Sequence, residues 1–413
     1  MIPDGRALLR FAALYSALYA GFGAASPFLP VFLSTRSVTP EGIGLIIGLN
    51  TGIRLIAGPW LGWMADRRHA VGGTLSICAL LAAGAAATVA AAHGFFLLLL
   101  ATLPYAAMLA PLPSLADALT LAAPQLRGAG RRLEYGWVRG IGSTAFIVGS
   151  LLSGRLAAVL GTNLVLVLQA ACLLAAAGIA FSAPVPPHGR TELFPVPSSR
   201  ILELLRLPSF RRTALVAALI LGSHALHDSF VMILWSSYDI GSSWGGLLWA
   251  ESVAAEVIVF VVLGPPIVRS VSSPAVMAIA ACAAAARWAL SSQATSVSEF
   301  ALIEPLHGLS FALLHLSCMR IITEVVSPGL LATAQSLYAF AIGASSVVVT
   351  LASGWLYARL GAGAFWIMAA LPISAAPLIW SLLKAGERQG EQLSSTVVAG
   401  MSAPESVMAE RSE

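Results

Sequence analysis

Long apolar stretches alternate with short polar connections along almost the whole chain. A membrane-spanning helix needs about 20 predominantly apolar residues, and twelve stretches of the 413-residue sequence are of that kind. They form two groups of six, at roughly 11–33, 42–64, 71–92, 95–121, 136–160 and 163–183, then 213–235, 245–268, 274–291, 299–326, 329–358 and 363–383. The pattern therefore predicts an all-α, polytopic membrane protein.

One longer polar connection divides the two groups. Residues 184–212 are rich in proline and basic side chains, whereas most other connections are short. We therefore expect residues 1–183 and 213–384 to form two six-helix bundles joined by a cytoplasmic linker. Residues 385–413 have no periodic apolar pattern, and we expect them to form a disordered cytoplasmic tail.

The composition excludes a water-soluble protein. The chain is 58% hydrophobic and 10% charged, with a mean hydropathy of +0.85, whereas soluble proteins are about 45–50% apolar and about 25% charged. Soluble enzymes and nucleic-acid-binding proteins are therefore excluded, and no nucleic-acid partner is expected. No metal or cofactor is expected either, because the four cysteines lie in apolar stretches without metal-type spacing, at Cys78, Cys172, Cys282 and Cys318.

The distribution of arginine indicates the orientation in the membrane. If the N-terminus is cytoplasmic, that side holds most of the arginines outside the spans, including those of the linker, and the opposite side holds Arg36, Arg155 and Arg359. Positively charged residues prefer cytoplasmic loops, so both termini are predicted to be cytoplasmic. Arginine outnumbers lysine 22 to 1, which suggests a GC-rich bacterial genome and a bacterial inner membrane.

A short internal repeat supports two related halves. The segments that begin at Ser153 and Ser353 agree at six of nine positions, and they close the fifth and eleventh spans. Two parallel six-helix repeats place a transport site near the middle of the membrane between them. The alternative is that helices rich in alanine, glycine and leucine resemble one another by composition.

The loop after the second span carries a recognisable motif. Residues 62–68 read GWMADRR, which resembles the G-x-x-x-D signature, followed by Arg or Lys, of major facilitator transporters at the same loop. The resemblance implies a cytoplasmic gating role for Gly62, Asp66 and Arg67.

A closer resemblance extends from about residue 10 to about residue 383. Several segments resemble the phenylpropionate permease family, which is related to lactose permease and to nucleoside–proton symporters. They are TPEGIGL at 39–45, PSLADAL at 113–119, YGWVR at 135–139, AEVI at 255–258, ARW at 286–288 and LHGLSF at 306–311.

The resemblance implies a major facilitator fold and a secondary active transporter that works by alternating access. It implies proton-coupled uptake of a small aromatic or other organic acid such as 3-phenylpropionate, by a monomer in the lipid bilayer. A carrier of sugars, nucleosides or drugs, including an exporter, is the nearest alternative. A membrane enzyme or sensor is disfavoured, because the sequence contains no HExxH, GxSxG or glycine-rich phosphate loop.

Charged residues within the apolar stretches are the candidate functional residues, because a charge at the bilayer centre costs about 2.5–3.5 kcal/mol. In the N-terminal half these include Arg54, Asp117 and Arg139. Asp117 and Arg139 resemble in position the pair that binds sugar in lactose permease. In this chain Phe146 stands where that transporter has a sugar-stacking tryptophan, and its phenyl ring would suit contact with an aromatic acid. Either arginine can hold a substrate carboxylate. The alternative is a structural Asp–Arg bridge between two helices.

The C-terminal half holds a second group, which includes Glu256, Arg287, Glu304 and His307. Arg287 and His307 resemble the proton-coupling arginine and histidine of lactose permease, and Glu256 resembles its acid on the eighth helix. A histidine beside an arginine and a carboxylate can take up and release protons near neutral pH. Glu256 and His307 are also candidates for substrate contact. Alternatively, His307 only forms hydrogen bonds between helices.

Two positions depart from lactose permease. Ser310 stands where that protein carries a carboxylate one turn beyond the histidine, so the proton needs another acid, either Glu256, Glu304 or Asp228. Asp228 resembles an acid that lactose permease pairs with a lysine, but the single lysine of this chain lies after the last span. Asp228 is therefore expected to pair with a histidine, an arginine or a proton, or to line water.

Overall fold

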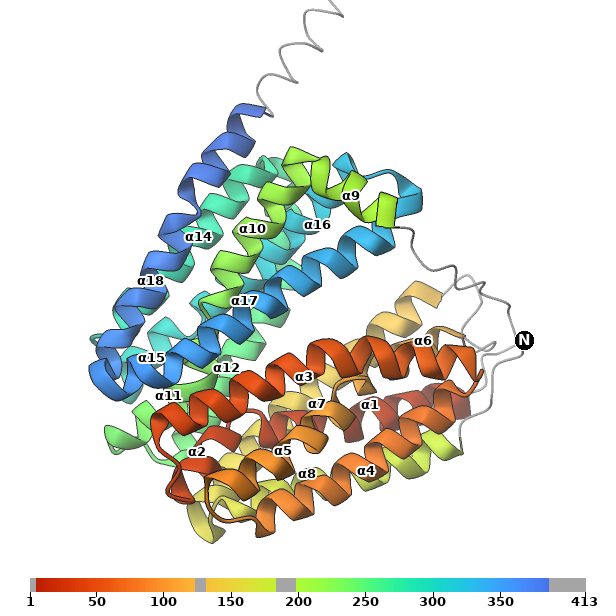
Figure 1. Ribbon diagram of the computed structural model, residues 1–413, viewed down its shortest axis with the longest axis vertical. Helices are drawn as coiled ribbons and strands as arrows, with labels where there is room; N and C mark the ends of the chain where they lie inside the picture. Colours follow the sequence, from red (N-terminus) through yellow and green to blue (C-terminus); the bar gives the residue numbers. More distant parts are fainter. Residues whose placement is uncertain (1–4, 123–130, 183–197, 386–413) are drawn as a thin grey trace, which may run out of the picture.

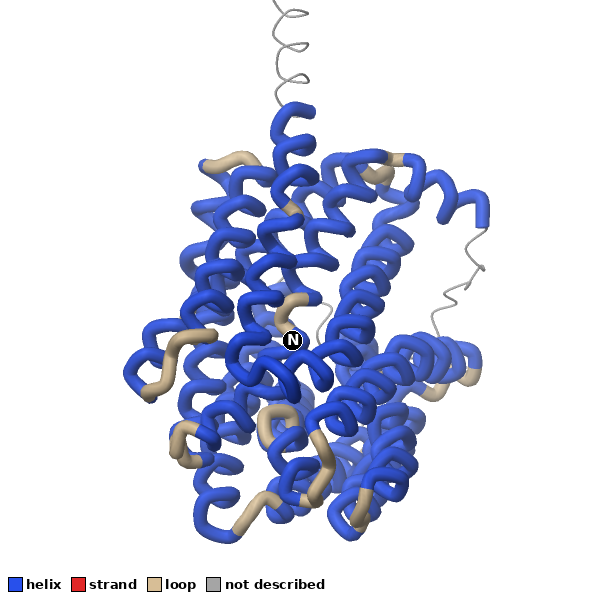
Figure 2. Tube along the Cα trace, turned by 60° about the vertical axis from the view of Figure 1, so that its left-hand side comes forward, coloured by secondary structure: helices blue, strands red, loops and turns tan. Residues whose placement is uncertain are grey.

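The computed structural model describes residues 5–122, 131–182 and 198–385, and these are almost entirely helical. Figure 1 shows two helical bundles, one from the first half of the chain (red to yellow) and one from the second (green to blue). Figure 2 shows that the remaining described residues form short connections, with no strand among them. The predicted tail, apart from Ala385, lies outside the described residues, as does the first part of the predicted linker.

In its described residues, the N-terminal bundle contains eight helical segments. They are α1 (Gly5–Ala25), α2 (Leu29–Thr35), α3 (Pro40–Arg67), α4 (Val71–Ala91), α5 (Phe95–Leu109), α6 (Leu112–Ala122), α7 (Arg131–Leu160) and α8 (Asn163–Phe181). The first and fourth predicted spans are each broken into two segments, at turns that contain Pro27 and Pro111. Proline lacks the N–H that a continuous helix requires, so each break follows from the local sequence.

The C-terminal bundle is less regular. Its elements are α9 (Ser198–Arg206), α10 (Pro208–Gly222), α11 (Ala225–Ser237), α12 (Ser242–Ile258), η2 (Val259–Leu263), α13 (Gly264–Ser270), α14 (Ser273–Ser291), α15 (Val297–Ile303), η3 (Gly308–Leu313), α16 (Leu314–Val325), η4 (Pro328–Leu330), α17 (Leu331–Leu360), η5 (Gly361–Gly363) and α18 (Ala364–Ser374). The segments η2 and η3 are π-helical, and they interrupt the eighth and tenth spans. Such π turns are rare and often occur at functional sites.

The described helices match the predicted spans. Eleven stretches are long and apolar enough to cross a membrane, and the last of them runs over 55 residues from Leu331 to Ala385. That stretch contains α17 and α18, separated only by the turn η5, and it corresponds to the eleventh and twelfth predicted spans. The predicted linker differs more, because α9 lies within it and α10 begins at Pro208 rather than near residue 213.

The two bundles meet closely at one end, where glycines allow helix backbones to touch. A Cβ atom added to Gly354 of α17 would lie 2.5 Å from the carbonyl oxygen of Pro40, at the start of α3. A Cβ atom added to Gly246 of α12 would lie 2.8 Å from a backbone carbonyl of α7. Small residues permit this close packing of membrane helices, and here they close the end that holds α2, α11 and α15 (Figure 1).

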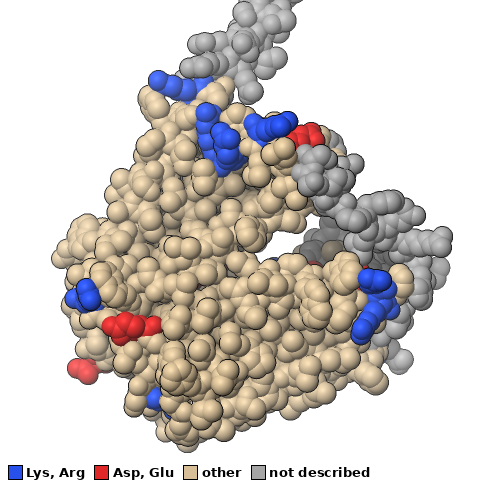
Figure 3. Space-filling model, viewed as in Figure 1, with Lys and Arg blue, Asp and Glu red and all other residues tan. Residues whose placement is uncertain are grey.

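At the other end the two halves separate. Figure 3 shows an opening between them on the side of α6 and α9. On the face shown, the charged side chains lie near the ends of the helices, and the broad middle carries almost none. An uncharged middle flanked by charged ends is the surface that a lipid bilayer requires.

Candidate functional site

A cavity of about 360 Å³ lies between the two halves. Its volume is within the range of about 300–1,000 Å³ that is typical of small-molecule sites. Helices α1, α2, α3, α5 and α8 line it from the N-terminal half, and α11, α12 and α17 line it from the C-terminal half. The walls combine aromatic rings with a few polar groups, which are Phe22, Tyr105 and Trp249, and Asn50, Thr51, Arg54, Gln169 and Asp228.

Arg54 supplies the positive charge of this cavity. It lies midway along α3, and its side chain is exposed to the cavity. It forms no ion pair or hydrogen bond with another described residue. The neighbouring polar groups bond to each other instead, since the Tyr105 hydroxyl donates to Gln169 Oε1 at 2.6 Å. The five N–H donors of Arg54 are therefore available to an anion.

Arg139 is engaged, in contrast to Arg54. Its Nη1 lies 3.4 Å from Asp117 Oδ1 and donates to the Tyr19 hydroxyl at 2.5 Å. The Tyr15 hydroxyl donates to the same carboxylate oxygen, and the Arg139 guanidinium lies over the Tyr19 ring at 5.5 Å. The structure thus brings together the predicted pair and adds two tyrosines that the sequence analysis had not identified.

Phe146 is part of a helix crossing. It lies on α7, and its backbone is so close to Gly23 of α1 that a Cβ atom at Gly23 would overlap the Phe146 carbonyl. It is not among the residues that line the central cavity. Its contact with a substrate ring remains a prediction.

A buried ion pair is the centre of the C-terminal group. Arg287 Nη2 of α14 lies 2.6 Å from Glu304 Oε2, and both side chains are completely buried. His227 Nε2 lies 3.1 Å from the other oxygen of Glu304, and Arg287 Nη1 lies 3.0 Å from His307 Nδ1. A buried charge pair needs further hydrogen bonds to offset its desolvation, and the two histidines supply them.

The group extends in both directions from this ion pair. His307 Nε2 lies 3.4 Å from Glu256 Oε2, and these two side chains are 16% and 25% exposed. On the other side, His227 Nδ1 lies 3.3 Å from Asp228 Oδ1, at the wall of the central cavity. Titratable groups therefore form a continuous chain from the cavity to the partly exposed carboxylate, in the order Asp228, His227, Glu304, Arg287, His307 and Glu256.

Two members of this group were not identified from the sequence as part of it. The histidine beside Asp228 is His227, and its contact with Glu304 was not predicted because it joins positions 77 residues apart. Trp288 packs against Arg287, with the guanidinium 4.6 Å from the ring centre. Trp288 directly follows a charged residue within a span, and this position could have marked it as part of the group.

Ser310 has a partner of its own. It lies in the π turn η3, fully buried, and its hydroxyl is 3.1 Å from His224 Nε2. It also donates to the backbone carbonyl of His307 at 3.2 Å. The position at which lactose permease carries a carboxylate is therefore occupied by a hydroxyl that links two spans.

The predicted gating motif lies at the separated end of the molecule. Asp66 and Arg67 are exposed at the end of α3, and Gly62 precedes them by one turn. The Arg67 guanidinium lies over the Trp63 ring, 5.2 Å from its centre. The gating role remains a prediction.

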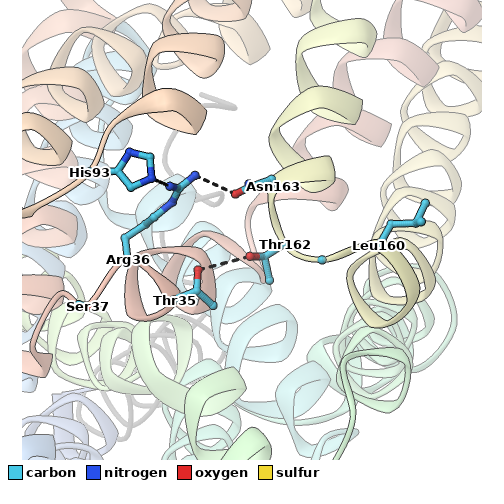
Figure 4. Close-up of a pocket in the computed structure, with 8 residues that line it drawn as sticks. Thr35, Arg36, Ser37, His93, Leu160, Thr162 and Asn163 are labelled. Carbon is cyan, nitrogen blue, oxygen red and sulfur yellow. Dashed lines mark hydrogen bonds between the residues drawn. The ribbon is translucent and has the colours of Figure 1, made fainter.

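A second cavity, of about 440 Å³, lies at the closed end, within the N-terminal half. Figure 4 shows Arg36 at its centre, hydrogen-bonded to His93 and, at 3.0 Å, to Asn163 Oδ1. Thr35 and Thr162 meet beside it at 3.5 Å. These contacts hold the connections before α3, α5 and α8 together. We therefore interpret the residues around this cavity as structural.

Comparison with known proteins agrees with this architecture. Residues 8–368 match the family model described as "MFS_1 like family". The chain is 30% identical over 366 residues to the "Probable 3-phenylpropionic acid transporter" of Escherichia coli (strain K12), an alignment that covers 87% of this chain and 94% of that protein.

Solved structures share the fold. A variant of the nucleoside transporter NupG has a TM-score of 0.82 at 17% identity, over 91% of this chain and 99% of its own. A bacterial homolog of the human lysosomal transporter Spinster has a TM-score of 0.72 at 14% identity, over 93% and 97%. The protein has a major facilitator fold, crosses the membrane several times and, as a transporter of a small molecule rather than an enzyme, belongs to the MFS_1 like family.

Proposed function

We propose that the protein takes up a small aromatic or other organic acid, such as 3-phenylpropionate, together with protons. The observation that carries this proposal is Arg54, a guanidinium without an acidic partner among the described residues, in a cavity with aromatic walls. The name of the Escherichia coli relative, a transporter of such an acid, supports the same substrate class.

Arg54 is the proposed anchor of the substrate carboxylate. A guanidinium can bind a carboxylate through two parallel hydrogen bonds, and the aromatic ring of the substrate would then contact Phe22 and Trp249. Arg139 is the less favourable anchor, because Asp117 already supplies it with a carboxylate. Arg139 and Asp117 would contact a substrate only after this pair separates.

Glu256 and His307 are the proposed site of the coupled proton. The loaded pair holds one proton, as carboxylate and imidazolium or as carboxylic acid and imidazole, and it becomes carboxylate and neutral imidazole when that proton leaves. Both side chains are partly exposed. Arg287 and Glu304 hold His307 in place from the buried side. Glu304 and Asp228 remain the other candidate acids, at the centre and at the cavity end of the same chain of contacts.

Alternating access would proceed by movement of the two halves about the glycine contacts. We propose that the separated end is cytoplasmic, because it holds α9 and the Gly62–Arg67 motif, and that both termini lie on that side. The membrane would be the bacterial inner membrane, and one monomer would be sufficient for transport, because both halves of the cavity come from a single chain.

Uptake into proteoliposomes tests the substrate and its anchor together. With an imposed inward proton gradient, the parent protein should accumulate labelled 3-phenylpropionate, and Arg54→Gln should reduce uptake at least about tenfold by removing a charged hydrogen bond. Arg359→Gln is the matched control, since Arg359 lies at the end of α17, outside the cavity, over the Trp355 ring.

Two results would contradict the proposal in different ways. Equal uptake by the parent and Arg54→Gln would remove Arg54 as the carboxylate anchor. If the folded parent shows no uptake above that of empty liposomes, the substrate class is wrong, and sugars, nucleosides and drugs are the next compounds to measure.

A further inference from the structure

The central cavity carries a negative charge opposite its positive one. Asp228 lies in the first turn of α11 and lines the cavity from the C-terminal half, with its side chain 58% exposed. Arg54 lines the same cavity from α3 of the N-terminal half. The cavity therefore has a positive and a negative wall. A ligand carboxylate can pair with Arg54 but leaves Asp228 without a partner from the ligand.

The carboxylate of Asp228 has spare hydrogen-bonding capacity. Its Oδ1 lies 3.3 Å from His227 Nδ1, which is longer than an ordinary charged hydrogen bond. No hydrogen bond within the described residues involves its second oxygen. An ionised carboxylate can accept about four hydrogen bonds, so Asp228 can accept several more from a ligand.

Asn50 adds a second unsatisfied group to the same cavity. It precedes Arg54 by one helical turn, is 4% exposed, and its Oδ1 has no hydrogen-bond partner among the described residues. The neighbouring Thr51 differs, since its hydroxyl donates to the Ile47 carbonyl at 2.8 Å. Asn50 and Asp228 thus both present hydrogen-bond acceptors without a full set of partners at this cavity.

Closure of the two halves around a substrate would remove water from Asp228. A buried carboxylate without donors is strongly unfavourable, so a ligand that brings a donor to Asp228 is favoured over one that brings only an apolar ring. A second carboxylate would instead meet Asp228 as a like charge.

We infer that the cavity selects acids with one carboxylate and a hydroxyl group on the aromatic ring, and that Asp228 is the specificity-determining residue. This inference rests on the proposed function and narrows its substrate class to hydroxyaryl carboxylates. Arg54 holds the carboxylate, and Asp228 accepts the hydrogen bond of the phenolic hydroxyl. Dicarboxylates are excluded by Asp228.

Competition against labelled 3-phenylpropionate in proteoliposomes tests the inference. For the parent, 3-(3-hydroxyphenyl)propionate should inhibit uptake at a concentration at least about tenfold lower than its methoxy analogue, which has a similar shape but no hydrogen-bond donor on the ring. In Asp228→Asn the ratio between the two competitors should fall to about twofold or less, and phenylsuccinate should begin to compete.

Asp239→Asn is the matched control variant. Asp239 lies in the turn after α11, is exposed, and has a positive φ of 58° that asparagine also adopts. It does not line the cavity, so this variant loses the same charge but should keep the preference for the hydroxylated acid. The comparison of the two acids in the parent needs no variant at all.

Three outcomes overturn the inference. The first is equal competition by the hydroxylated and methoxylated acids in the parent, and the second is an unchanged preference in Asp228→Asn. The third is loss of gradient-driven uptake of both acids in Asp228→Asn, which would make Asp228 a coupling residue instead. A parent that binds none of these acids contradicts the proposed function itself, so the two failures are distinguishable.

Discussion

At the scale of single residues, two pairs of charged groups inside the membrane differ in kind. Arg287 and Glu304 are completely buried and bonded to each other and to histidines, whereas Arg54 and Asp228 are exposed to a cavity. The first pair stabilises the fold and holds His307. The second pair has free hydrogen-bonding capacity, which is the property that a binding site requires.

Removing one partner of the buried ion pair should destabilise the protein. Glu304→Gln leaves the Arg287 charge buried without a carboxylate, a change that costs about 3–5 kcal/mol, so thermal unfolding in detergent should occur at a clearly lower temperature. Glu324→Gln is the control, because Glu324 forms an exposed pair with Arg320 at 2.8 Å, which contributes about 0–1 kcal/mol. Equal effects of the two variants would mean that the buried pair is not a structural centre.

The proposed role of His307 in proton coupling can be tested separately from any effect on folding or substrate binding. His307→Ala removes the group that links Glu256 to Arg287, so uptake driven by a proton gradient should fall at least about tenfold. Exchange of labelled for unlabelled substrate across the membrane needs no net proton movement, and it should be retained. Loss of exchange together with uptake would place His307 in substrate binding or in the fold.

Arginine and histidine positions were predictable because charges are rare in apolar stretches. Their partners were not, since the contacts of Arg139 with Tyr19 and of Glu304 with His227 join residues 120 and 77 positions apart. A single sequence carries no signal for pairs so far apart. The prediction that Asp117 meets Arg139 succeeded only because a family resemblance supplied the pairing.

At the scale of helices, the apolar pattern predicted every span but not their interruptions. The π turns η2 and η3 consist of ordinary apolar residues and small ones, so their composition does not differ from that of an α-helix. The short helix α9 was not predicted, because its nine residues lie in a proline-rich segment that was interpreted as a linker. Helix boundaries in membrane proteins thus depend on tertiary packing that composition does not reveal.

The glycine contacts between the halves offer a test of how the closed end is sealed. Gly354→Val introduces a side chain where even a Cβ atom would lie 2.5 Å from a backbone oxygen, so α3 and α17 should separate. A cysteine at Ser26, which lines the central cavity, should then react faster with an impermeant thiol reagent applied from the side of the closed end.

The control for this substitution is Gly84→Val. Gly84 lies in α4, and no other atom lies within 4 Å of a Cβ added there. This variant should leave the labelling rate of the Ser26 cysteine unchanged. If Gly354→Val also leaves the rate unchanged, the seal does not depend on contact between α3 and α17.

At the scale of the whole molecule, the two halves touch at one end and separate at the other (Figures 1 and 3). We expect the separated end to face the cytoplasm, where positively charged connections accumulate. A fluorescent protein fused after residue 385 should therefore be fluorescent in the cell, and a periplasmic phosphatase fused after Thr162 should be active. The reverse pattern would invert the orientation and the inferred direction of opening.

In the proposed transport cycle, helix α3 combines a pivot and a binding group in one element. Gly44 lies at the contact between the halves and Arg54 at the cavity, ten residues apart on the same helix, which corresponds to about 15 Å along its axis. With that lever arm, each 10° of tilt about Gly44 displaces Arg54 by about 2.6 Å. In that cycle a ligand bound to Arg54 would move together with α3, so attraction of the ligand toward the opposite wall of the cavity would also tilt the helix.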